Sequence, residues 1–285
     1  KFKYNKHSPP ETHDVIKDYP ILFDTNYIGS GEYYMNSSIG VLNANTPDAE
    51  IDVDNEQIGI YFKNSGTYIV EEVYYSDKKR AVRIHSSYNE MINKLIYSYC
   101  LENIDFKDND VIIDCGANIG ELGLFFSEQN FSVNYIGLEP SIKEFSACKL
   151  NNPHSEILNL GLWNKKSKLN FYIKSETADS SVFEIDDYKE IVTIKVDRLD
   201  KIINKEKYKS IKLLKIDAEG AEPEILEGTK NLLGIIEYIS VDVGPERGID
   251  QKSTDSEVTT FLTKNNFKLI TENTNRKSKL FQNKH

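Results

Sequence analysis

The stretch whose residue types could do chemistry is 111–123, which reads VIIDCGANIGELG. Its apolar start predicts a strand buried on both faces, and Asp114 ends that strand. The turn that follows lets the backbone approach a ligand closely, and a helix is expected from Glu121. Strand, turn and helix N-terminus together predict a nucleotide-sized site at the carboxyl end of a parallel strand. Its candidate binding residues are Asp114, Gly116, Ala117, Asn118 and Gly120.

The spacing of the glycines indicates which cofactor this site would take. A dinucleotide fingerprint reads G-x-G-x-x-G, whereas Asp114, Gly116 and Gly120 give D-x-G-x-x-x-G, without the middle glycine. S-adenosylmethionine carries an amino acid and a sulfonium but no phosphate, so it suits an acid placed before the turn. A turn whose glycines serve only helix packing is the alternative.

A second acid follows the next expected strand, 133–138. Glu139 lies where a carboxylate can accept both ribose hydroxyls, and Ser141 is placed to cap a helix over 142–150. A third strand is expected over 156–160, and its carboxyl end would meet the adenine edge. The expected adenosine-binding residues are Glu139, Pro140, Ser141, Asn159 and Gly161.

Four segments together carry a family resemblance. DCGANIG, GLEPS, LDKI and LLKIDAEGAEPEILEG are similar to the FkbM family of S-adenosylmethionine-dependent methyltransferases, over roughly residues 86 to 272. The most specific part is I-D-x-E-G-x-E followed by an apolar pair and glycine. The resemblance implies a doubly wound, Rossmann-like class I methyltransferase fold and, usually, O-methylation of a sugar or polyketide hydroxyl.

Methyl transfer to a hydroxyl needs a held sulfonium, an in-line nucleophile and a group that removes the proton. Asp217 follows the expected strand 211–216 on the same rim as the two cofactor acids, so we expect it to be a base, a metal ligand or a cofactor contact. Glu219 would position the acceptor hydroxyl or the cofactor. His85 could accept the proton instead of Asp217, or it could have only a structural role.

The same group of acids also suits a divalent cation. Asp217, Glu219 and Glu222, with Asp242 from the next strand, could hold Mg²⁺ through oxygen ligands, although no residue is assigned as a metal ligand. Glu222 alone could simply favour a helix N-terminus. Three further residues have weaker expectations: Tyr88 and Glu90 at the methionine end of the cofactor, and Arg247 on an anionic substrate group or a loop surface.

The composition of the chain limits the kinds of partner that it is expected to bind. The net charge of −10 argues against a nucleic-acid substrate, and no apolar run approaches the length of a membrane span. The three cysteines, Cys100, Cys115 and Cys148, are widely spaced and are interpreted as small apolar side chains in a reducing compartment, which favours the cytoplasm. The expected partner is a small molecule or glycan, and a homo-oligomer is compatible with the sequence.

Alternating strands and helices predict an α/β fold with a mostly parallel sheet. We place the methyltransferase domain at 86–285, with an antiparallel hairpin (267–271 and 279–282) closing its sheet and a further hairpin at 168–173 and 191–196. Residues 1–85 are expected to form an arm and a small β-rich region, with strands at 58–62, 67–70 and 81–84 and a role as lid, substrate contact or dimer contact. A nicotinamide-dependent oxidoreductase and a non-catalytic nucleotide-binding protein are the competing functions.

Overall fold

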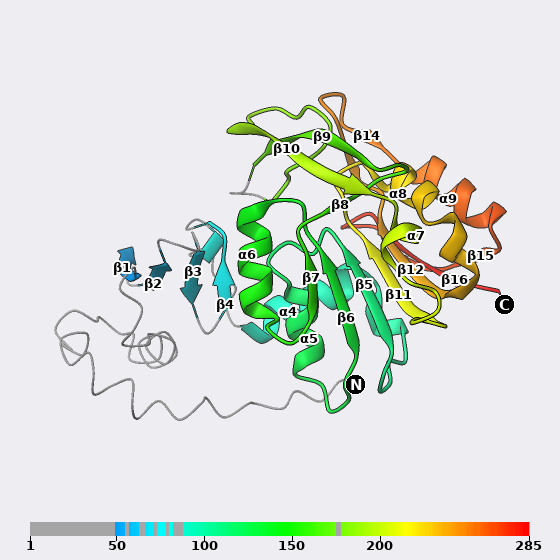
Figure 1. Cartoon of the computed structure of the whole chain (residues 1–285), viewed down its shortest axis with the longest axis horizontal. Helices are drawn as coiled ribbons and strands as arrows, with labels where there is room; N and C mark the ends of the chain where they lie inside the picture. The colour runs from blue at the N-terminus through cyan, green and yellow to red at the C-terminus, as the bar shows by residue number, and fades with distance from the viewer. Residues whose placement is uncertain are drawn as a thin grey trace.

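The computed structural model of the 285-residue chain describes residues 49–54, 57–62, 67–70, 73–77, 80–81, 88–174 and 178–284. It has a large central sheet with helices on both faces, and a smaller sheet that lies beside helix α6 (Figure 1). The strands of the two sheets come from different parts of the sequence, the smaller sheet being N-terminal.

Seven strands form the central sheet, in the order β15-β16-β12-β11-β5-β6-β7. The run from β12 to β7 is parallel, whereas β16 is antiparallel to both of its neighbours. The expected mostly parallel sheet with an antiparallel last strand is therefore confirmed. The strands are β5 (Val111–Cys115), β6 (Asn134–Leu138), β7 (Glu156–Leu158), β11 (Ile211–Ile216), β12 (Ile236–Asp242), β15 (Phe267–Asn273) and β16 (Ser278–Asn283).

Two apolar cores cover the two faces of this sheet because successive strand residues point to opposite sides. Ile112 and Leu213 are fully buried in one core, together with helices α4 (Tyr88–Ser98) and α5 (Glu121–Ser127). Ile113 and Leu214 are fully buried in the other. That second core includes α7 (Leu199–Ile202), α8 (Glu222–Gly228), η4 (Lys230–Ile235) and α9 (Asp255–Lys264).

The N-terminal sheet is an antiparallel meander in the order β1-β2-β3-β4. Its last strand packs against α6 (Ile142–Asn151), where Val73 is buried with Ile119 and Ala147. The Asn151 side chain extends this contact, because it bonds both the N–H and the carbonyl oxygen of Tyr74, at 2.8 and 2.9 Å. The strands are β1 (Ala49–Asp54), β2 (Gln57–Phe62), β3 (Thr67–Val70) and β4 (Val73–Tyr75).

A β-hairpin projects from the main domain between β7 and β11. Its strands β9 (Ser167–Ile173) and β10 (Glu190–Asp197) pair antiparallel, as the alternation of their residues predicted, and β10 also pairs with the short strand β8 (Gly161–Leu162). The remaining elements are short: η3 (Leu101–Asn103), β13 (Pro245–Arg247) and β14 (Lys252–Ser253).

Most expected elements lie where the sequence placed them, with ends that differ by a few residues. One expected strand, 81–84, is not borne out at its first residue, because Ala81 is helical, and the rest of it lies outside the described residues. β4 was not predicted because its three residues are too few to show alternation. The expected N-terminal arm lies outside the described residues, which begin at residue 49.

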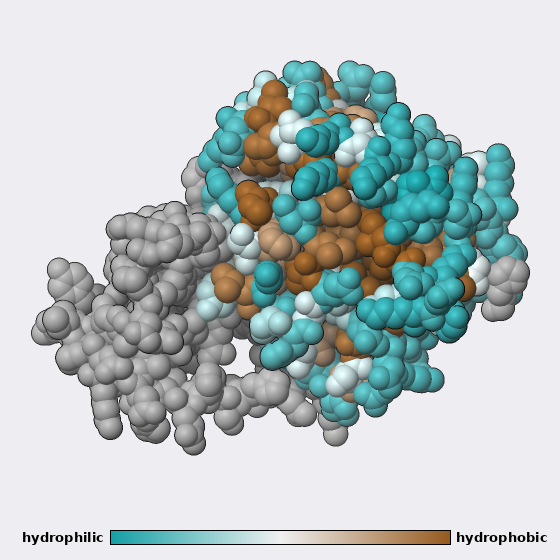
Figure 2. Space-filling view, viewed as in Figure 1, coloured by the Kyte–Doolittle hydropathy of each residue, from teal (hydrophilic) through white to brown (hydrophobic). Residues whose placement is uncertain are grey.

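All three cysteines are free and buried, in agreement with their interpretation as small apolar side chains. Across the described part of the chain, no helix has the length and apolar character that crossing a bilayer requires. On the face shown in Figure 2, apolar side chains gather in the middle and hydrophilic side chains surround them.

Candidate functional site

The glycine turn after β5 lies directly against the end of β11. Gly116 has φ of 72°, and a Cβ on it would overlap the carbonyl oxygen of Asp217, so only glycine fits here. The N–H groups of Gly116 and Ala117 both donate to the Leu138 carbonyl oxygen, at 3.0 and 3.1 Å. The turn is therefore fixed between the ends of β6 and β11. At Gly116 its backbone carries no side chain where it lies at the carboxyl ends of the strands.

Asp114 lies beneath this turn and is almost completely buried, at 1% exposure. Its carboxylate pairs with Lys215 Nζ at 3.0 Å and accepts a hydrogen bond from the Tyr135 hydroxyl at 2.7 Å. Lys215 also donates to the Gly116 carbonyl oxygen at 2.9 Å. Burial lowers the pKa of Lys215, but the anionic neighbours, Asp114 first, outweigh it, so the lysine stays charged. Asp114 thus acts on the turn through Lys215.

Glu139 holds two loops with one carboxylate. Its oxygens accept hydrogen bonds from the Ser141 and Asn118 N–H groups, at 2.8 and 2.9 Å. Burial, and then the nearby Glu144 carboxylate, raise the pKa of Glu139 to about 8. A buried acceptor of this kind gains from ligand hydroxyls that donate to it, which is the property that binding a ribose requires.

The residues around Glu139 hold it in place. The Ser141 hydroxyl donates to Glu144, whose other oxygen accepts from Ser76 at 3.0 Å. Asn159 is exposed, and its amide donates to the carbonyl oxygens of Glu139 and Pro140, at 3.0 and 2.9 Å. Asn159 therefore fixes the loop that carries Glu139. The residues after Asn159, 160–162, line the cavity described next.

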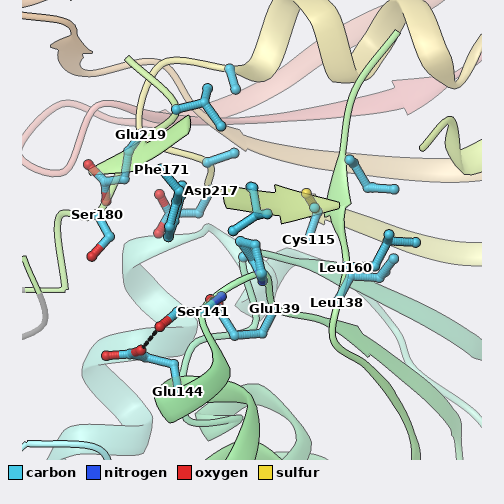
Figure 3. A pocket seen from close by; sticks show the side chains of 18 of the residues that line it. Cys115, Leu138, Glu139, Ser141, Glu144, Leu160, Phe171, Ser180, Asp217 and Glu219 are labelled. Atoms are coloured by element: carbon cyan, nitrogen blue, oxygen red, sulfur yellow. Dashed lines mark hydrogen bonds between the residues drawn. The ribbon is translucent and has the colours of Figure 1, made fainter. Parts of the chain in front are cut away.

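A first cavity opens above the Glu139 loop (Figure 3). Apolar side chains from several strands line most of it, while Glu139, Asp217 and Glu219 bring carboxylates to it. The predicted residues that line it are Gly116, Asn118, Glu139, Pro140, Ser141, Gly161, Asp217 and Glu219. Gly120 instead serves packing: it has φ of 86° at the start of α5, and a Cβ there would overlap the Asn152 side chain.

A second, more polar cavity adjoins the first across Gly116, Asn118, Asp217 and Glu219, which line both. It continues between the glycine turn and helix α4. Its wall includes Ala117 from the turn and four cationic side chains: Arg80, Lys94, Lys215 and Arg276. The two cavities together therefore form one continuous site with an apolar part, which carries buried acids, and a charged part.

Asp217 lies where the two cavities meet, and two side chains hold its carboxylate. Tyr99 donates its hydroxyl to Asp217, and Arg276 Nη2 lies 3.0 Å from the same oxygen. Burial on its own raises the pKa of Asp217, but Lys215 and Arg276, with the hydrogen bond from Tyr99, hold it below its usual range. Asp217 is therefore an anion that binds protons weakly.

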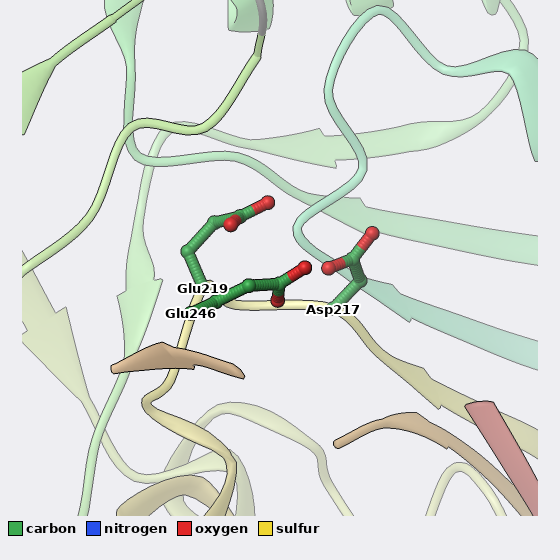
Figure 4. A group of neighbouring side chains, drawn as sticks. All are labelled: Asp217, Glu219 and Glu246. Atoms are coloured by element: carbon green, nitrogen blue, oxygen red, sulfur yellow. The ribbon is translucent and has the colours of Figure 1, made fainter. Parts of the chain in front are cut away.

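Two further carboxylates lie next to Asp217 (Figure 4). Oxygens of Asp217, Glu219 and Glu246 lie within 4.8 Å of one another. Burial, and then the charges of Asp217 and Glu246, raise the pKa of Glu219 well above its usual value. Burial, and then Asp242 and Asp217, raise the pKa of Glu246 to about 8. The group therefore combines one low-pKa and two high-pKa carboxylates.

Glu222 and Asp242 are not members of this group, contrary to the expected set of magnesium ligands. Glu222 accepts from the N–H groups of Ala218 and Gly220, at 3.2 and 3.0 Å, and from the Thr254 hydroxyl at 3.0 Å. Asp242 pairs with Arg276 Nε at 2.8 Å. Glu222 thus shapes the loop after β11, and Asp242 helps to orient Arg276.

Arg247 also differs from its expected roles. Its guanidinium makes two hydrogen bonds to Glu224, at 2.8 and 2.6 Å, and lies 4.1 Å from the centre of the Phe183 ring. It also donates to the Gly220 carbonyl oxygen at 2.7 Å. These contacts tie the loop that carries Glu219 to the loop after β9, so Arg247 positions the site.

Three of the predicted residues cannot be placed as side chains. His85 lies outside the described residues. Tyr88 and Glu90 lie in α4, one wall of the second cavity, but their side chains are outside the described part of the structure. The residues that sequence reasoning missed are Arg80, Tyr99, Lys215, Glu246 and Arg276. Lys215 lies within the LLKIDAEG segment of the family resemblance, but its pairing with Asp114 leaves no signal in the sequence, and the other four lie outside the motifs.

Comparison with known proteins identifies the family. A family model described as the methyltransferase FkbM domain matches residues 114–269, which is more than half of the 285-residue chain. The chain belongs to the FkbM methyltransferase family. The strand order of this FkbM protein is accordingly that of a class I methyltransferase sheet, as the resemblance implied. No curated protein sequence gives a match.

The comparison with solved structures gives distant matches, including the following three. The N-terminal domain of human METTL16 in complex with SAH has 11% identity and a TM-score of 0.38, covering 98% of this chain and 95% of that one. A TehB-like SAM-dependent methyltransferase from Corynebacterium glutamicum has 10% identity and a TM-score of 0.36, covering 70% and 100%. Magnesium protoporphyrin IX methyltransferase from Synechocystis PCC 6803 with bound SAM has 8% identity and a TM-score of 0.32, covering 67% and 76%.

The residues of this FkbM protein fit S-adenosylmethionine. The turn at Gly116 is a cradle that a Cβ would fill, and Glu139 presents a buried carboxylate to the first cavity. The second cavity offers both cations and acids, which suits the zwitterionic amino-acid end of the cofactor. This combination separates the site from a pyrophosphate-binding site, where backbone N–H groups and a helix N-terminus dominate.

Proposed function

We propose that this protein catalyses O-methylation of a hydroxyl on a sugar or other small glycan or natural-product acceptor, with S-adenosylmethionine as methyl donor. The observation that carries the proposal is a group of carboxylates beside the cofactor cavities: oxygens of Glu219, Glu246 and Asp217 lie within 4.8 Å of one another, and burial raises the pKa of Glu219 and of Glu246. A neutral hydroxyl must lose its proton during methyl transfer, and a base whose pKa lies near the working pH removes it most effectively.

The geometry supports the following assignment of cofactor residues. Glu139 would hold the ribose hydroxyls, the Gly116 turn would lie along the cofactor backbone, and apolar residues of the first cavity, including Leu138 and Leu160, would flank the adenine. When bound, S-adenosylmethionine supplies an electrophilic methyl group on its sulfonium. Glu139, Pro140, Ser141 and Gly161 remain proposed contacts, while Asp114 and Asn159 would act by holding the loops that make them.

A third cavity supports the position of the acceptor. Glu219 lines it together with Glu246, Asp179 and Asp186, and Lys174 reaches it from the loop after β9. Carboxylates accept hydrogen bonds from the several hydroxyls of a polyol, and their charge disfavours phosphate groups. These features support a small uncharged acceptor and argue against a nucleic acid.

We assign the role of the base, which removes the proton of the acceptor hydroxyl, to Glu246 or Glu219 and not to Asp217. Asp217 binds protons weakly because Arg276 and Tyr99 stabilise its anion. Asp217 would instead orient the acceptor or the amino group of the cofactor. Because the three carboxylates lie within 4.8 Å of one another, Mg²⁺ is a rival use of the same group, and the assay below separates the two.

The first test is calorimetric titration with S-adenosylhomocysteine. We expect micromolar binding to the wild-type protein and a loss of roughly 1–3 kcal/mol in Glu139→Ala, because the hydrogen bonds of Glu139 to the ribose hydroxyls are removed. Glu227→Gln, an exposed acid on α8, is the control and should bind normally. A folded wild-type protein that does not bind would overturn the proposal and leave the two competing functions, which a parallel titration with NADH separates.

The second test is methyl transfer to a panel of monosaccharides and matched amines, each with EDTA and with added Mg²⁺. We expect methylated hydroxyls, activity in EDTA, and loss of the chemical step in Glu246→Gln or Glu219→Gln. Methylation confined to amines would overturn the choice of acceptor. Activity that disappears in EDTA and returns with Mg²⁺ would replace the base by a metal site.

A further inference from the structure

The segment before the matched domain reaches into the cofactor site. Ser76, just after β4, donates to Glu144 in the network that holds Glu139. Further along, Arg80 Nη1 donates to Asn118 Oδ1 in the glycine turn at 2.6 Å, and Nη2 lies 3.4 Å from Glu121 Oε1. Ser76 and Arg80 therefore contact both halves of the site, although the family match starts only at residue 114.

Arg80 is placed as a ligand-binding group of the second cavity. Its side chain is 13% exposed and lines the cavity between the glycine turn and α4. Its bond to Asn118 fixes the guanidinium beside the turn, while the 3.4 Å contact with Glu121 is long for an ion pair. A fixed guanidinium with a weak anionic partner can bind a second carboxylate through its planar fork.

The other cations of this cavity are less suited to that task. Lys215 is held by Asp114 and the Gly116 carbonyl oxygen, and Arg276 lies between the carboxylates of Asp217 and Asp242. Lys94 on α4 is exposed, so its ammonium is well hydrated. The acids Asp179, Asp217 and Glu219 also line the cavity, which therefore carries charges of both signs.

We propose that Arg80 is a cofactor-binding residue, whose guanidinium pairs with the carboxylate at the amino-acid end of S-adenosylmethionine or S-adenosylhomocysteine. This inference rests on the proposed use of the first cavity for adenosine, since the amino-acid end then extends past Gly116 into the second cavity. A segment outside the matched domain would thus complete the cofactor site and exclude water from its charged end.

Two ligands that differ only at that end test the proposal. S-adenosylhomocysteine carries the amino acid, and 5′-methylthioadenosine keeps the adenine, ribose and sulfur without it. Calorimetry would measure both on the full chain, as wild type, Arg80→Gln, Arg80→Lys and Lys94→Gln. The charge-matched control is Lys107→Gln, whose side chain is 71% exposed. Thermal melting would verify that each variant is folded.

We expect Arg80→Gln to weaken S-adenosylhomocysteine roughly 10- to 100-fold, the range of a charged hydrogen-bonded pair, and to leave 5′-methylthioadenosine within about twofold. Arg80→Lys should be intermediate, and Lys107→Gln unchanged. An equal loss for both ligands would show that Arg80 only holds the glycine turn, and a selective loss in Lys94→Gln alone would move the contact to Lys94; either result overturns the proposal. Wild-type protein that binds neither ligand would instead refute the proposed function itself.

Discussion

Replacing Lys215 by methionine tests the buried ion pair beneath the glycine turn. The lysine side chain is 6% exposed and that of Asp114 is 1% exposed, with 3.0 Å between Nζ and Oδ1. Methionine preserves the packing along the stem but leaves the Asp114 carboxylate with only the Tyr135 hydroxyl as a side-chain partner among the described residues. The Gly116 carbonyl oxygen loses its donor as well.

The expected cost follows from the burial of the remaining charge. Removing one partner of a buried pair typically costs about 3–5 kcal/mol, because the other charge stays desolvated and uncompensated. For a protein of this size the melting temperature should fall by roughly 6 to 20 °C. Asp114→Asn with Lys215→Met removes both charges, so the double variant should recover much of the loss.

Urea unfolding, followed by far-ultraviolet circular dichroism and by tyrosine fluorescence, measures these differences and shows whether the transition has two states. A cost below about 1 kcal/mol for Lys215→Met, the value of a surface pair, would refute the view that the pair is desolvated. A double variant no better than the single one would show that the Lys215 contact with the Gly116 carbonyl oxygen, rather than the pair with Asp114, dominates.

Three other predictions concern the site. Gly116→Ala should abolish S-adenosylhomocysteine binding in calorimetry, because its Cβ overlaps the Asp217 carbonyl oxygen, whereas Gly234→Ala, with open space around it, should bind normally. Activity should rise about tenfold per pH unit until pH reaches about 8, where the Glu246 carboxyl becomes ionised and able to accept a proton, and Glu246→Gln should remove this dependence. Arg276→Gln takes away one of the two cations that stabilise the Asp217 anion, the other being Lys215, so the pKa of Asp217, followed by NMR titration, should rise. A pH profile unchanged in Glu246→Gln, or an unshifted Asp217, would contradict the assigned roles.

The sheet and the cofactor loops could be predicted because their signals are local. Apolar runs such as 111–113, followed by an acid and a glycine turn, define both an element and the end of it. Glu139 was found in the same way, since it closes the next strand. The β9–β10 hairpin could be predicted from the alternation of apolar and polar residues in both of its strands.

The charged partners could not be predicted because pairing across a fold leaves no local pattern. Lys212 and Lys215 lie in one strand, IKLLKI, and look equivalent in sequence. In the structure Lys212 meets Glu237 on the next strand, while Lys215 lies buried against Asp114. The sequence likewise does not show that Glu246, four residues after the end of β12, returns to the acids after β11.

The position of β16 has a consequence for how this protein is made. The last strand in the sequence is not at an edge: it lies between β12 and β15, with hydrogen bonds on both sides. Until residues 278–283 leave the ribosome, β12 has an open edge of unpaired N–H and carbonyl groups, which is a template for aggregation. Because Arg276 lies two residues before that strand, the ion pairs of Arg276 with Asp217 and Asp242 cannot form earlier. Folding and assembly of the site should therefore finish together, after most of the domain has been synthesised.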